Sequence, residues 1–390
     1  MIRVGFILNC DANWMGGLNY LRNLLFAISA MPGKRIHPIV FIGHSAGSEL
    51  HNFFKPYAEV ITLPLFDRNS PLYWLWKATK HIFRSDAFLE FALKKYKIDV
   101  FSHSMVLGLK KAKIINWIPD FQHLHLPQLF SPAEIEFRNH QFLTVARKSD
   151  TVILSSNDAF KDFRSAFADY SDKVRVLHFV AQPDRRLFRN TPEKEAEILE
   201  KHGIRERYFF IPNQFWKHKN HRTVFEAIKL LKDKGHEIML VCSGAKVECR
   251  NQAHIEELQK MVSDLHLNIK ILGLIDYEEV FILMKRSMAV INPSLFEGWS
   301  STVEECKSIG KNMILSDIPV HREQNHPLAV YFPPLDSEEL SRIMLQTMLD
   351  TRPVSAVKNE TDLLEKLEQK TLEFARSYEQ IVCETIEISK

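Results

Sequence analysis

The sequence predicts an α/β protein with two doubly wound domains, each built on a parallel β-sheet with helices on both faces. Short apolar runs alternate with longer helical patterns, which is the order that a parallel sheet with crossover helices requires. The chain has 390 residues, a length that suits two hydrophobic cores better than one. The alternation weakens near residues 182–195, where Pro183 and Pro192 stand among charged residues. We expect a linker there.

The first half of the chain carries five short apolar runs of the kind that form buried strands. They lie at residues 2–8, 38–42, 60–63, 114–118 and 151–154. A helix is expected at residues 18–30, because four leucines recur there at the spacing of one helical face. This half predicts one domain over residues 1–185.

The second half repeats the pattern over residues 190–365 and predicts a second domain. Its expected strands lie at residues 208–211, 238–242, 269–272, 289–291 and 312–315. Its expected helices lie at residues 223–234 and 255–265, and a charged helix is expected at 363–388. Two doubly wound domains in tandem favour a ligand cleft between them, at the carboxyl ends of the strands.

The composition is that of a soluble globular protein, with 45% hydrophobic and 25% charged residues. The formal net charge of +3 is too balanced to indicate a nucleic-acid partner. The five cysteines are scattered without a CxxC pair, which favours a reducing compartment over a disulfide framework or a zinc site. The apolar run at residues 2–8 is too short for a signal peptide, and no stretch approaches the ~20 apolar residues of a membrane span. We expect a cytoplasmic protein.

The segment 292–305 carries the strongest functional pattern. Glu297 stands in a turn after an apolar strand, and Glu305 follows eight residues later, inside a helix. The free N–H groups at the start of that helix suit a phosphate, and the hydroxyls of Ser300, Ser301 and Thr302 add donors or cap the helix. Carboxylates beside such a site can accept hydrogen bonds from sugar hydroxyls. The alternative interpretation is a capped surface helix with ordinary acidic residues.

The segment 213–221 is basic and lies between an expected strand and an expected helix. Lys217 and Lys219, with two histidines, have the charge to neutralise a diphosphate. A solvated basic loop is the alternative. Earlier in the chain, Gly16 and Gly17 stand between the first strand and the first helix, where glycines let the backbone approach a ligand closely. They do not form the GxGxxG fingerprint, and a tight turn needs glycine equally.

Two further segments carry polar or amphipathic patterns. Asp120, in segment 118–127, follows a strand and has the chemistry to take or orient a proton of an acceptor. It could equally cap the following turn, with the nearby histidines structural. Residues 73–84 combine aromatic side chains with Lys77, Lys80 and Arg84, which suits a helix on an anionic membrane surface. The alternative is a core-facing helix with a solvated basic edge.

The segment 292–305 resembles the E-x7-E motif of retaining GT-B glycosyltransferases, family 4 in particular. Residues 293–298 match the family's motif sequence closely, and residues 316–319 follow at the spacing usual in the family. The resemblance implies that Glu297 contacts the donor sugar and that Glu305 holds the ribose hydroxyls. It also implies that backbone amides near residues 300–302 meet sugar and phosphate. The family often has Gly, Pro and Ala where this chain has Ser300, Thr302 and Cys306, so the sugar preference is open.

The basic loop also resembles the family's phosphate motif, an Arg followed by Lys-Asn. Lys219 and Asn220 match the Lys-Asn end, whereas Gln214 stands where the family usually has Arg. One charge of the expected clamp is therefore missing. We hypothesise that Lys217 compensates for it.

The segment expected to bind the acceptor, residues 118–127, departs from the family's sequence at one position. Many members carry His-Asp before an apolar stretch, whereas here Pro119 occupies the histidine position and Asp120 keeps the aspartate. A catalytic role of that histidine cannot be transferred, and His123 is the substitute candidate. The family also has a glycine-rich loop facing the donor, which implies the same role for Gly16 and Gly17.

The resemblance implies a GT-B enzyme that moves a hexose, with retained configuration, from a UDP- or GDP-linked donor to a glycan or lipid-linked acceptor. The first domain would bind the acceptor and the second the nucleotide-sugar, and a helix at 368–390 would pack back on the first domain. Bacterial polysaccharide or lipopolysaccharide synthesis is the commonest setting, with possible membrane contact through residues 73–84. No metal or cofactor is expected, since the chain has neither metal-ligand spacing nor a DxD pair after a strand. The alternatives are a GT-B sugar-nucleotide epimerase and a non-catalytic sugar-nucleotide binder.

Overall fold

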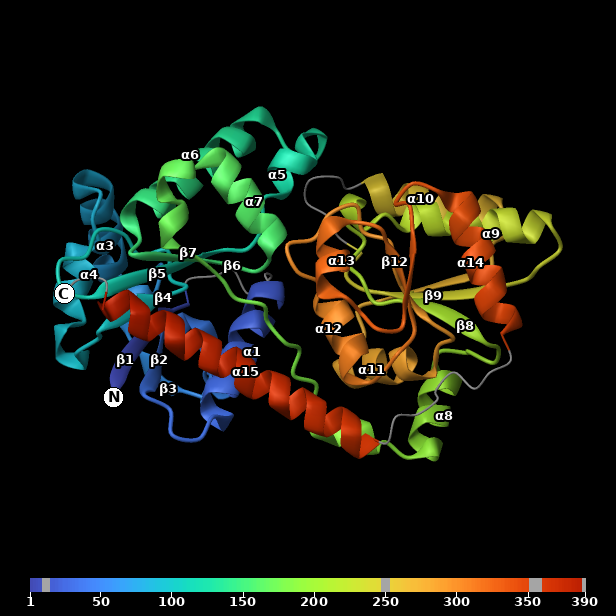
Figure 1. The fold of residues 1–390 in the computed structure, drawn as a ribbon, viewed down its shortest axis with the longest axis horizontal. Helices are drawn as coiled ribbons and strands as arrows, with labels where there is room; N and C mark the ends of the chain where they lie inside the picture. The colour runs from blue at the N-terminus through green and yellow to red at the C-terminus, as the bar shows by residue number, and fades with distance from the viewer. Residues whose placement is uncertain (9–14, 247–252, 351–359, 388–390) are drawn as a thin grey trace. The chain divides into compact units, whose positions relative to one another are not determined.

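The computed structural model describes residues 1–8, 15–246, 253–350 and 360–387, which divide into two compact units (Figure 1). The first unit comprises Met1–Phe121, Pro132–Gln182 and Glu368–Lys390. The second comprises Gln122–Ser131 and Pro183–Leu367. Each unit has its own parallel sheet, in agreement with the α/β class that the sequence predicts.

The sheet of the first unit runs in the order β3-β2-β1-β4-β5-β6-β7, and all its neighbouring strands are parallel. The strands are β1 (Ile2–Ile7), β2 (Ile36–Ile42), β3 (Glu59–Thr62), β4 (Val100–Ser102), β5 (Lys113–Ile118), β6 (Thr151–Leu154) and β7 (Val174–Val176). The sequence pattern missed β4 and β7. Each has three residues, which is too short for an apolar run to stand out.

The helices of the first unit cover both faces of this sheet (Figure 1). They are α1 (Met15–Ala30), α2 (Gly47–Phe54), α3 (Pro71–Phe83), α4 (Ala87–Ala92), α6 (Pro132–Lys148), α7 (Asn157–Ala166) and the greater part of α15 (Glu360–Glu387). Gly16 and Gly17 lie in the first turn of α1, so the prediction that they belong to the preceding loop is wrong. A pattern of apolar residues starting at Leu18 marks only where the buried face begins.

Helix α15 packs on the first unit although it ends the chain. The ring of Tyr378 is fully buried and lies 6.3 Å from the ring of Phe6 on β1. A buried hydrogen bond of 2.7 Å joins the hydroxyls of Thr385 and Thr151, the first residue of β6. The C-terminal helix therefore completes the core that the first half of the chain begins.

The sheet of the second unit runs in the order β10-β9-β8-β11-β12-β13, again with parallel neighbours. The strands are β8 (Tyr208–Ile211), β9 (Met239–Ser243), β10 (Ile269–Gly273), β11 (Val290–Asn292), β12 (Met313–Ser316) and β13 (Ala329–Phe332). Along β8, Phe209 and Ile211 enter one core whereas Tyr208 and Phe210 enter the other. Both faces of this sheet are buried, which explains why its strands are continuous apolar runs. The sequence missed β13 because charged and proline-rich segments flank it.

The second unit carries most of its helices between these strands. They are α8 (Pro192–Lys201), α9 (His221–Asp233), α10 (Ala253–Asp264), α11 (Tyr277–Arg286), α12 (Ser301–Ser308), α13 (Pro319–Gln324) and α14 (Ser337–Leu349). The predicted linker at 182–195 is wrong in its second half. Thr191 caps α8 and Pro192 takes its first turn, where the missing N–H of proline costs nothing.

Candidate functional site

The candidate site lies in the second unit, where the order of strands reverses between β8 and β11. Connections from β8 proceed outward to β9, and those from β11 proceed outward to β12, so the loops after β8 and β11 diverge at this point. Ligands of open α/β sheets bind at such a place, at the carboxyl ends of the strands. Asn213 follows β8 and Asn292 ends β11, and their side chains share a hydrogen bond of 3.2 Å. The two loops that the sequence singled out therefore meet.

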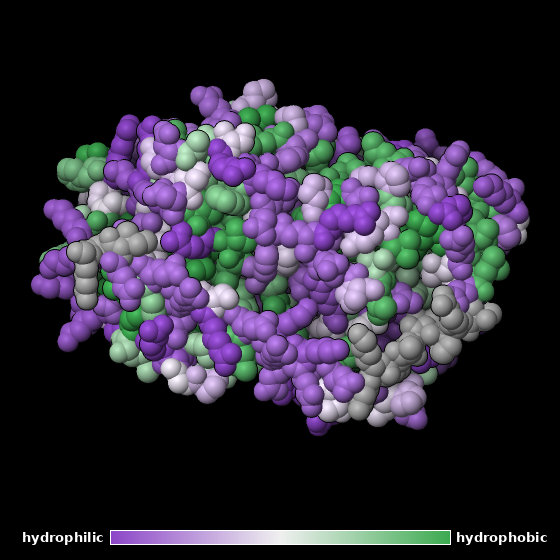
Figure 2. All heavy atoms as spheres, in the orientation of Figure 1, coloured by the Kyte–Doolittle hydropathy of each residue, from purple (hydrophilic) through white to green (hydrophobic). Residues whose placement is uncertain are grey.

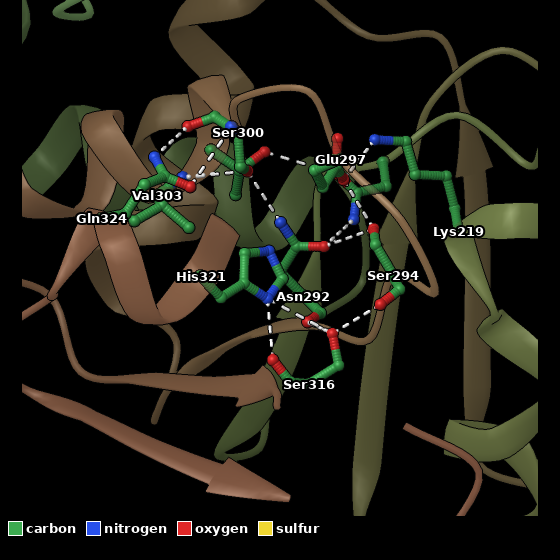
Figure 3. Close-up of polar contacts among 11 residues, drawn as sticks. Lys219, Asn292, Ser294, Glu297, Ser300, Val303, Ser316, His321 and Gln324 are labelled. Carbon is green, nitrogen blue, oxygen red and sulfur yellow. Dashed lines mark hydrogen bonds and ion pairs between the residues drawn. The ribbon is translucent and has the colours of Figure 1, made fainter. Parts of the chain in front are cut away.

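Lys219 and Glu297 form an ion pair across these loops (Figure 3). The Nζ of Lys219 lies 2.6 Å from Oε1 of Glu297, and the hydroxyl of Ser294 lies 2.6 Å from the same oxygen. The side chains of Glu297 and Lys219 keep 9% and 17% of their exposure. Within the described residues Oε2 of Glu297 accepts no hydrogen bond. This oxygen can therefore receive a hydroxyl group of a bound molecule.

The charge state of Glu297 follows from two opposing effects. Burial raises the pKa of the Glu297 carboxyl, because a charged group loses its hydration. The charges of Lys219 and His218, with the hydrogen bonds from Lys219 and Ser294, outweigh burial and hold the pKa below its ordinary value. Glu297 is thus a carboxylate at neutral pH and acts as a hydrogen-bond acceptor.

A buried amide network holds the loop of Glu297 in place. The Nδ2 of Asn292 donates to the Ser300 hydroxyl at 2.8 Å, and its Oδ1 lies 2.8 Å from the Ser294 hydroxyl (Figure 3). The Ser316 hydroxyl donates to the carbonyl oxygen of Ser294 at 2.6 Å. Because these groups are buried, breaking any one leaves a polar atom without its partner. The network makes the turn before α12 rigid.

The predicted donor-binding hydroxyls fall into two environments. Ser300 caps α12, and its own N–H donates to Oε1 of Gln324 at 3.2 Å. The Thr302 hydroxyl donates to Oδ1 of Asn213 at 3.3 Å, and both Ser300 and Thr302 are buried. Ser301, the first residue of α12, is exposed. Ser300 and Thr302 thus stabilise the loops of the site through buried hydrogen bonds, whereas Ser301 faces solvent.

Glu305 lies in α12, as the sequence predicts, and is half-buried. Its Oε1 accepts a hydrogen bond of 3.0 Å from the hydroxyl of Tyr277, the first residue of α11. The Tyr277 side chain is 41% exposed. No sequence pattern indicated Tyr277, since the contact joins residues of two different crossover connections.

The basic loop contains a short helical turn, Lys217–Lys219, that ends at a left-handed residue. Asn220 has φ 55° and ψ 38°, a conformation that asparagine tolerates better than most residues. Its amide nitrogen donates to the carbonyl oxygens of Pro293 and Pro334 at 3.1 and 2.7 Å. Asn220 thereby fixes the position of Lys219 against the loop of Glu297. Lys217 is exposed, and Gln214 is half-buried.

A glycine directly after β9 lets the backbone of this loop approach closely. Gly244 has φ 143°, and a Cβ on it would lie 2.4 Å from the carbonyl oxygen of Asn213. No other residue fits such a contact. A hydrogen bond of 3.1 Å from the N–H of Phe215 to the carbonyl oxygen of Ala245 joins the two segments beside this contact.

The two predicted acceptor residues, Asp120 and His123, belong to different units of the chain. Asp120 follows β5 in the first unit, and its Oδ1 lies 3.5 Å from Nη1 of Arg138 on α6. His123 lies in a short helix, α5 (Gln122–His125), which groups with the second unit. His123 is buried, with 1% of its surface exposed. The exposed His125 has its ring 5.0 Å from that of Phe296, beside Glu297. Of these two histidines, His123, which the sequence pattern favoured, is the buried one.

A polar cluster at the strand reversal of the first unit was not predicted. His103 follows β4 with φ 56°, and its ring nitrogens lie 2.9 Å from the Tyr20 hydroxyl and 2.7 Å from the Ser102 hydroxyl. Burial lowers the pKa of His103 to about 3, so the imidazole is neutral. The Ser-His-Ser sequence at 102–104 was the available signal, but the shortness of β4 hid its position at a strand end. The segment 9–14, which includes part of the predicted glycine loop, lies outside the described residues.

Neither a metal-binding cluster nor a membrane-spanning helix is found in the described part of the chain. No three His, Cys, Asp or Glu side chains gather there as a metal site would need. No helix of this part of the chain is both long and apolar enough to cross a bilayer.

The candidate site lies in a part of the chain that is similar to a known protein family. Residues 194–363 match the model of the family described as glycosyl transferases group 1. Over 170 residues the chain is 29% identical to the O-antigen chain mannosyltransferase RfbU of Salmonella typhimurium, which is 43% of this chain and 42% of that protein. The chain thus matches less than half the length of this curated relative.

Solved structures share the fold of nearly the whole chain. Anabaena HepE, in complex with UDP and glucose, has a TM-score of 0.67 and 14% identity over 98% of this chain and 100% of that one. WaaG, a glycosyltransferase involved in lipopolysaccharide biosynthesis, has a TM-score of 0.61 and 13% identity over 99% of both chains. The predicted GT-B fold with two Rossmann-like α/β domains is confirmed. The assignment to family 4 and the cleft between the domains stay predictions.

Proposed function

We propose, from the match of residues 194–363 to the family described as glycosyl transferases group 1, that this chain transfers a hexose from a nucleoside-diphosphate sugar. The donor is UDP- or GDP-linked, and the acceptor is a glycan or a lipid-linked glycan of bacterial surface polysaccharide or lipopolysaccharide. The donor binds to the second unit, and acceptor binding involves the first. The names of RfbU and WaaG support the surface-polysaccharide setting.

The pairing of Lys219 with Glu297 at the strand reversal is the observation that carries this proposal. A nucleotide-sugar presents a diphosphate beside sugar hydroxyls, and the site presents a cation beside a carboxylate with one free oxygen. Lys219 suits the diphosphate as a charged donor. Glu297 suits a sugar hydroxyl, and Glu305 suits the ribose. The side chain of Lys217 supplies a second positive charge where Gln214 lacks one.

The transfer step needs no group beyond the two substrates. The bond between the anomeric carbon and the diphosphate oxygen breaks, and the nucleoside diphosphate leaves with the electron pair. The acceptor oxygen bonds to the same face of that carbon, and its proton passes to the leaving diphosphate. Lys219 and the N-terminal end of α12 stabilise the developing negative charge, so the proposal requires no metal.

For binding of the acceptor we retain Asp120 and replace His123 by His125. Asp120 orients the acceptor hydroxyl, while the burial of His123 favours a structural role for that residue. His125, exposed beside Phe296, is better suited to contact a substrate. We place the chain in the cytoplasm, at the inner face of the membrane, where lipid-linked acceptors are glycosylated.

Calorimetry with UDP, GDP, UDP-glucose and GDP-mannose tests the donor, followed by an assay of acceptor-dependent nucleotide release in the presence of a chelator. We expect one base to bind and its sugar to transfer without added metal. Release of nucleotide without acceptor would favour an epimerase instead. Absence of binding by every nucleotide would contradict the proposal.

A further inference from the structure

Helix α3 (Pro71–Phe83) is apolar on the face it buries and also on the face it exposes. Tyr73 and Trp76 are buried, and the indole N–H of Trp76 donates to the fully buried Asp86 at 2.7 Å. These contacts fix α3 on the first unit and determine which side it turns outward. A surface helix ordinarily presents polar side chains there, so an apolar outer face requires an explanation.

The outer face of α3 carries four apolar side chains at helical spacing. Trp74 is 63% exposed, Leu75 is 49% exposed, and Ile82 is 69% exposed, with the exposed Ala78 between them. Positions 74, 75, 78 and 82 fall on one stripe of a helix, opposite the buried Tyr73 and Trp76. In Figure 2, hydrophobic side chains gather at the margin of the first unit, at the place that α3 occupies in Figure 1.

Further exposed apolar side chains lie at and just beyond the ends of α3. Phe83, its last residue, is 72% exposed, Leu72 near its start is 46% exposed, and Phe91 on the adjacent helix α4 is 75% exposed. Helices α3 and α4 pack on one another. We call Trp74, Leu75, Ala78 and Ile82 the α3 outer face.

The stretch of sequence that contains α3 is strongly positive. Residues 68–97 contain seven Lys and Arg against two Asp and Glu, whereas the whole chain contains 51 against 48. The two acids do not offset this charge at the surface. Asp86 is buried beside Lys80, and Glu90 accepts backbone N–H groups of residues 110–112. Arg68 and Arg84 are exposed and form no ion pair within the described residues.

We propose that the α3 outer face binds the surface of an anionic lipid bilayer. Trp74, Leu75 and Ile82 enter the interfacial layer, and Arg68 and Arg84 contact lipid phosphates. The positive surroundings favour a bilayer over a second copy of the same chain, because two copies of this face would repel each other. This inference rests on the part of the proposed function that locates the chain at the inner face of a membrane.

Sedimentation of the whole chain with vesicles, in the absence of any donor, tests the proposal. We expect binding to vesicles of phosphatidylcholine mixed with phosphatidylglycerol, much weaker binding to phosphatidylcholine alone, and a decrease with salt. The double variant Trp74→Ser/Ile82→Ser should weaken binding at least about tenfold, because it removes two apolar anchors. Arg84→Glu should weaken it about fivefold or more on anionic vesicles only.

Phe137→Ser is the matched control, because Phe137 is 65% exposed on α6 of the same unit. We expect this variant to bind vesicles like the wild type, and thermal melting should show all variants folded. Equal binding by the wild type and the double variant would overturn the proposal. A dimer of the wild type in light scattering, lost in Trp74→Ser/Ile82→Ser, would also overturn the proposal. Since no donor is present, failure of donor binding leaves this result unaffected.

Discussion

The Nζ of Lys219 lies 2.6 Å from Oε1 of Glu297, although the two residues are 78 positions apart in the sequence. The contact exists because β8 and β11 are neighbours in the sheet, so the loops that follow them meet at one edge. In the absence of a ligand the ammonium neutralises the carboxylate. A bound diphosphate would share that ammonium with the carboxylate.

Lys219→Met should reverse the pH dependence that Glu297 gives to folding stability. In the wild type the pKa of Glu297 is held below its ordinary value of 4.5, so its contribution is present above that pH and is lost as the pH falls through the folded-state pKa. Without the ammonium, burial dominates and raises the pKa of Glu297, and ionisation then opposes folding as the pH rises. Thermal melting between about pH 4 and pH 8 measures this. In the double variant Lys219→Met/Glu297→Gln the reversed pH dependence of stability should disappear. If it persisted, a titratable group other than Glu297 would cause it.

Lys217 and Lys219 should contribute unequally to the binding of nucleoside diphosphate. Lys219→Ala removes a partly buried charge and should weaken binding at least about thirtyfold, whereas Lys217→Ala removes an exposed one and should weaken it about fivefold. Calorimetry with the preferred nucleotide measures both. Lys229→Ala, which removes a surface lysine of α9, is the control. Unchanged affinity in Lys217→Ala would remove the idea that Lys217 replaces the missing arginine at Gln214.

Glu297→Gln and Glu305→Gln should separate turnover from nucleotide affinity. Glu297→Gln keeps the shape of the side chain but loses the charge, and we expect kcat to fall about a hundredfold with little change in nucleotide affinity. Glu305→Gln should weaken nucleotide binding about tenfold, because a hydrogen bond to a charged group is lost. Initial rates and calorimetry on the same preparations distinguish these effects. Equal losses of nucleotide affinity in both variants would contradict the division of roles.

Much of the second unit followed from the sequence because its strands are buried on both faces. Runs such as residues 208–211 are continuously apolar for that reason, and the pattern marks them clearly. The three-residue strand β4 leaves no such run, so its place at the strand reversal of the first unit could not be predicted. His103, at the end of that strand, was missed with it.

The local sequence identified Glu297, Glu305 and Lys219, but not the groups that hold them. Asn213 and Asn292 meet only because the sheet order places β8 beside β11, and no local pattern encodes that order. The same limit explains the choice of His123. Two histidines in one segment look alike in the sequence, and only the structure separates the buried His123 from the exposed His125.

Asn220 offers a test of how rigidly the site is held, because its backbone and its side chain can be changed separately. Asn220→Gly keeps the left-handed conformation but loses the side-chain bonds to Pro293, Pro334 and Thr223, and should lower the free energy of unfolding by about 1–3 kcal/mol. Asn220→Ala should lower it further, by about 1 kcal/mol, because alanine is strained at positive φ.

Both variants of Asn220 should weaken nucleotide binding more than their small losses of stability explain, since Lys219 loses its fixed position. Chemical denaturation gives the stability, and calorimetry on the folded protein gives the affinity. Asn325→Gly is the matched control, because the exposed Asn325 is also left-handed, at the end of α13, and its side chain makes no hydrogen bond within the described residues. It should leave both quantities unchanged or raise stability slightly. If Asn220→Gly behaved like Asn325→Gly, the amide of Asn220 would have no part in positioning Lys219.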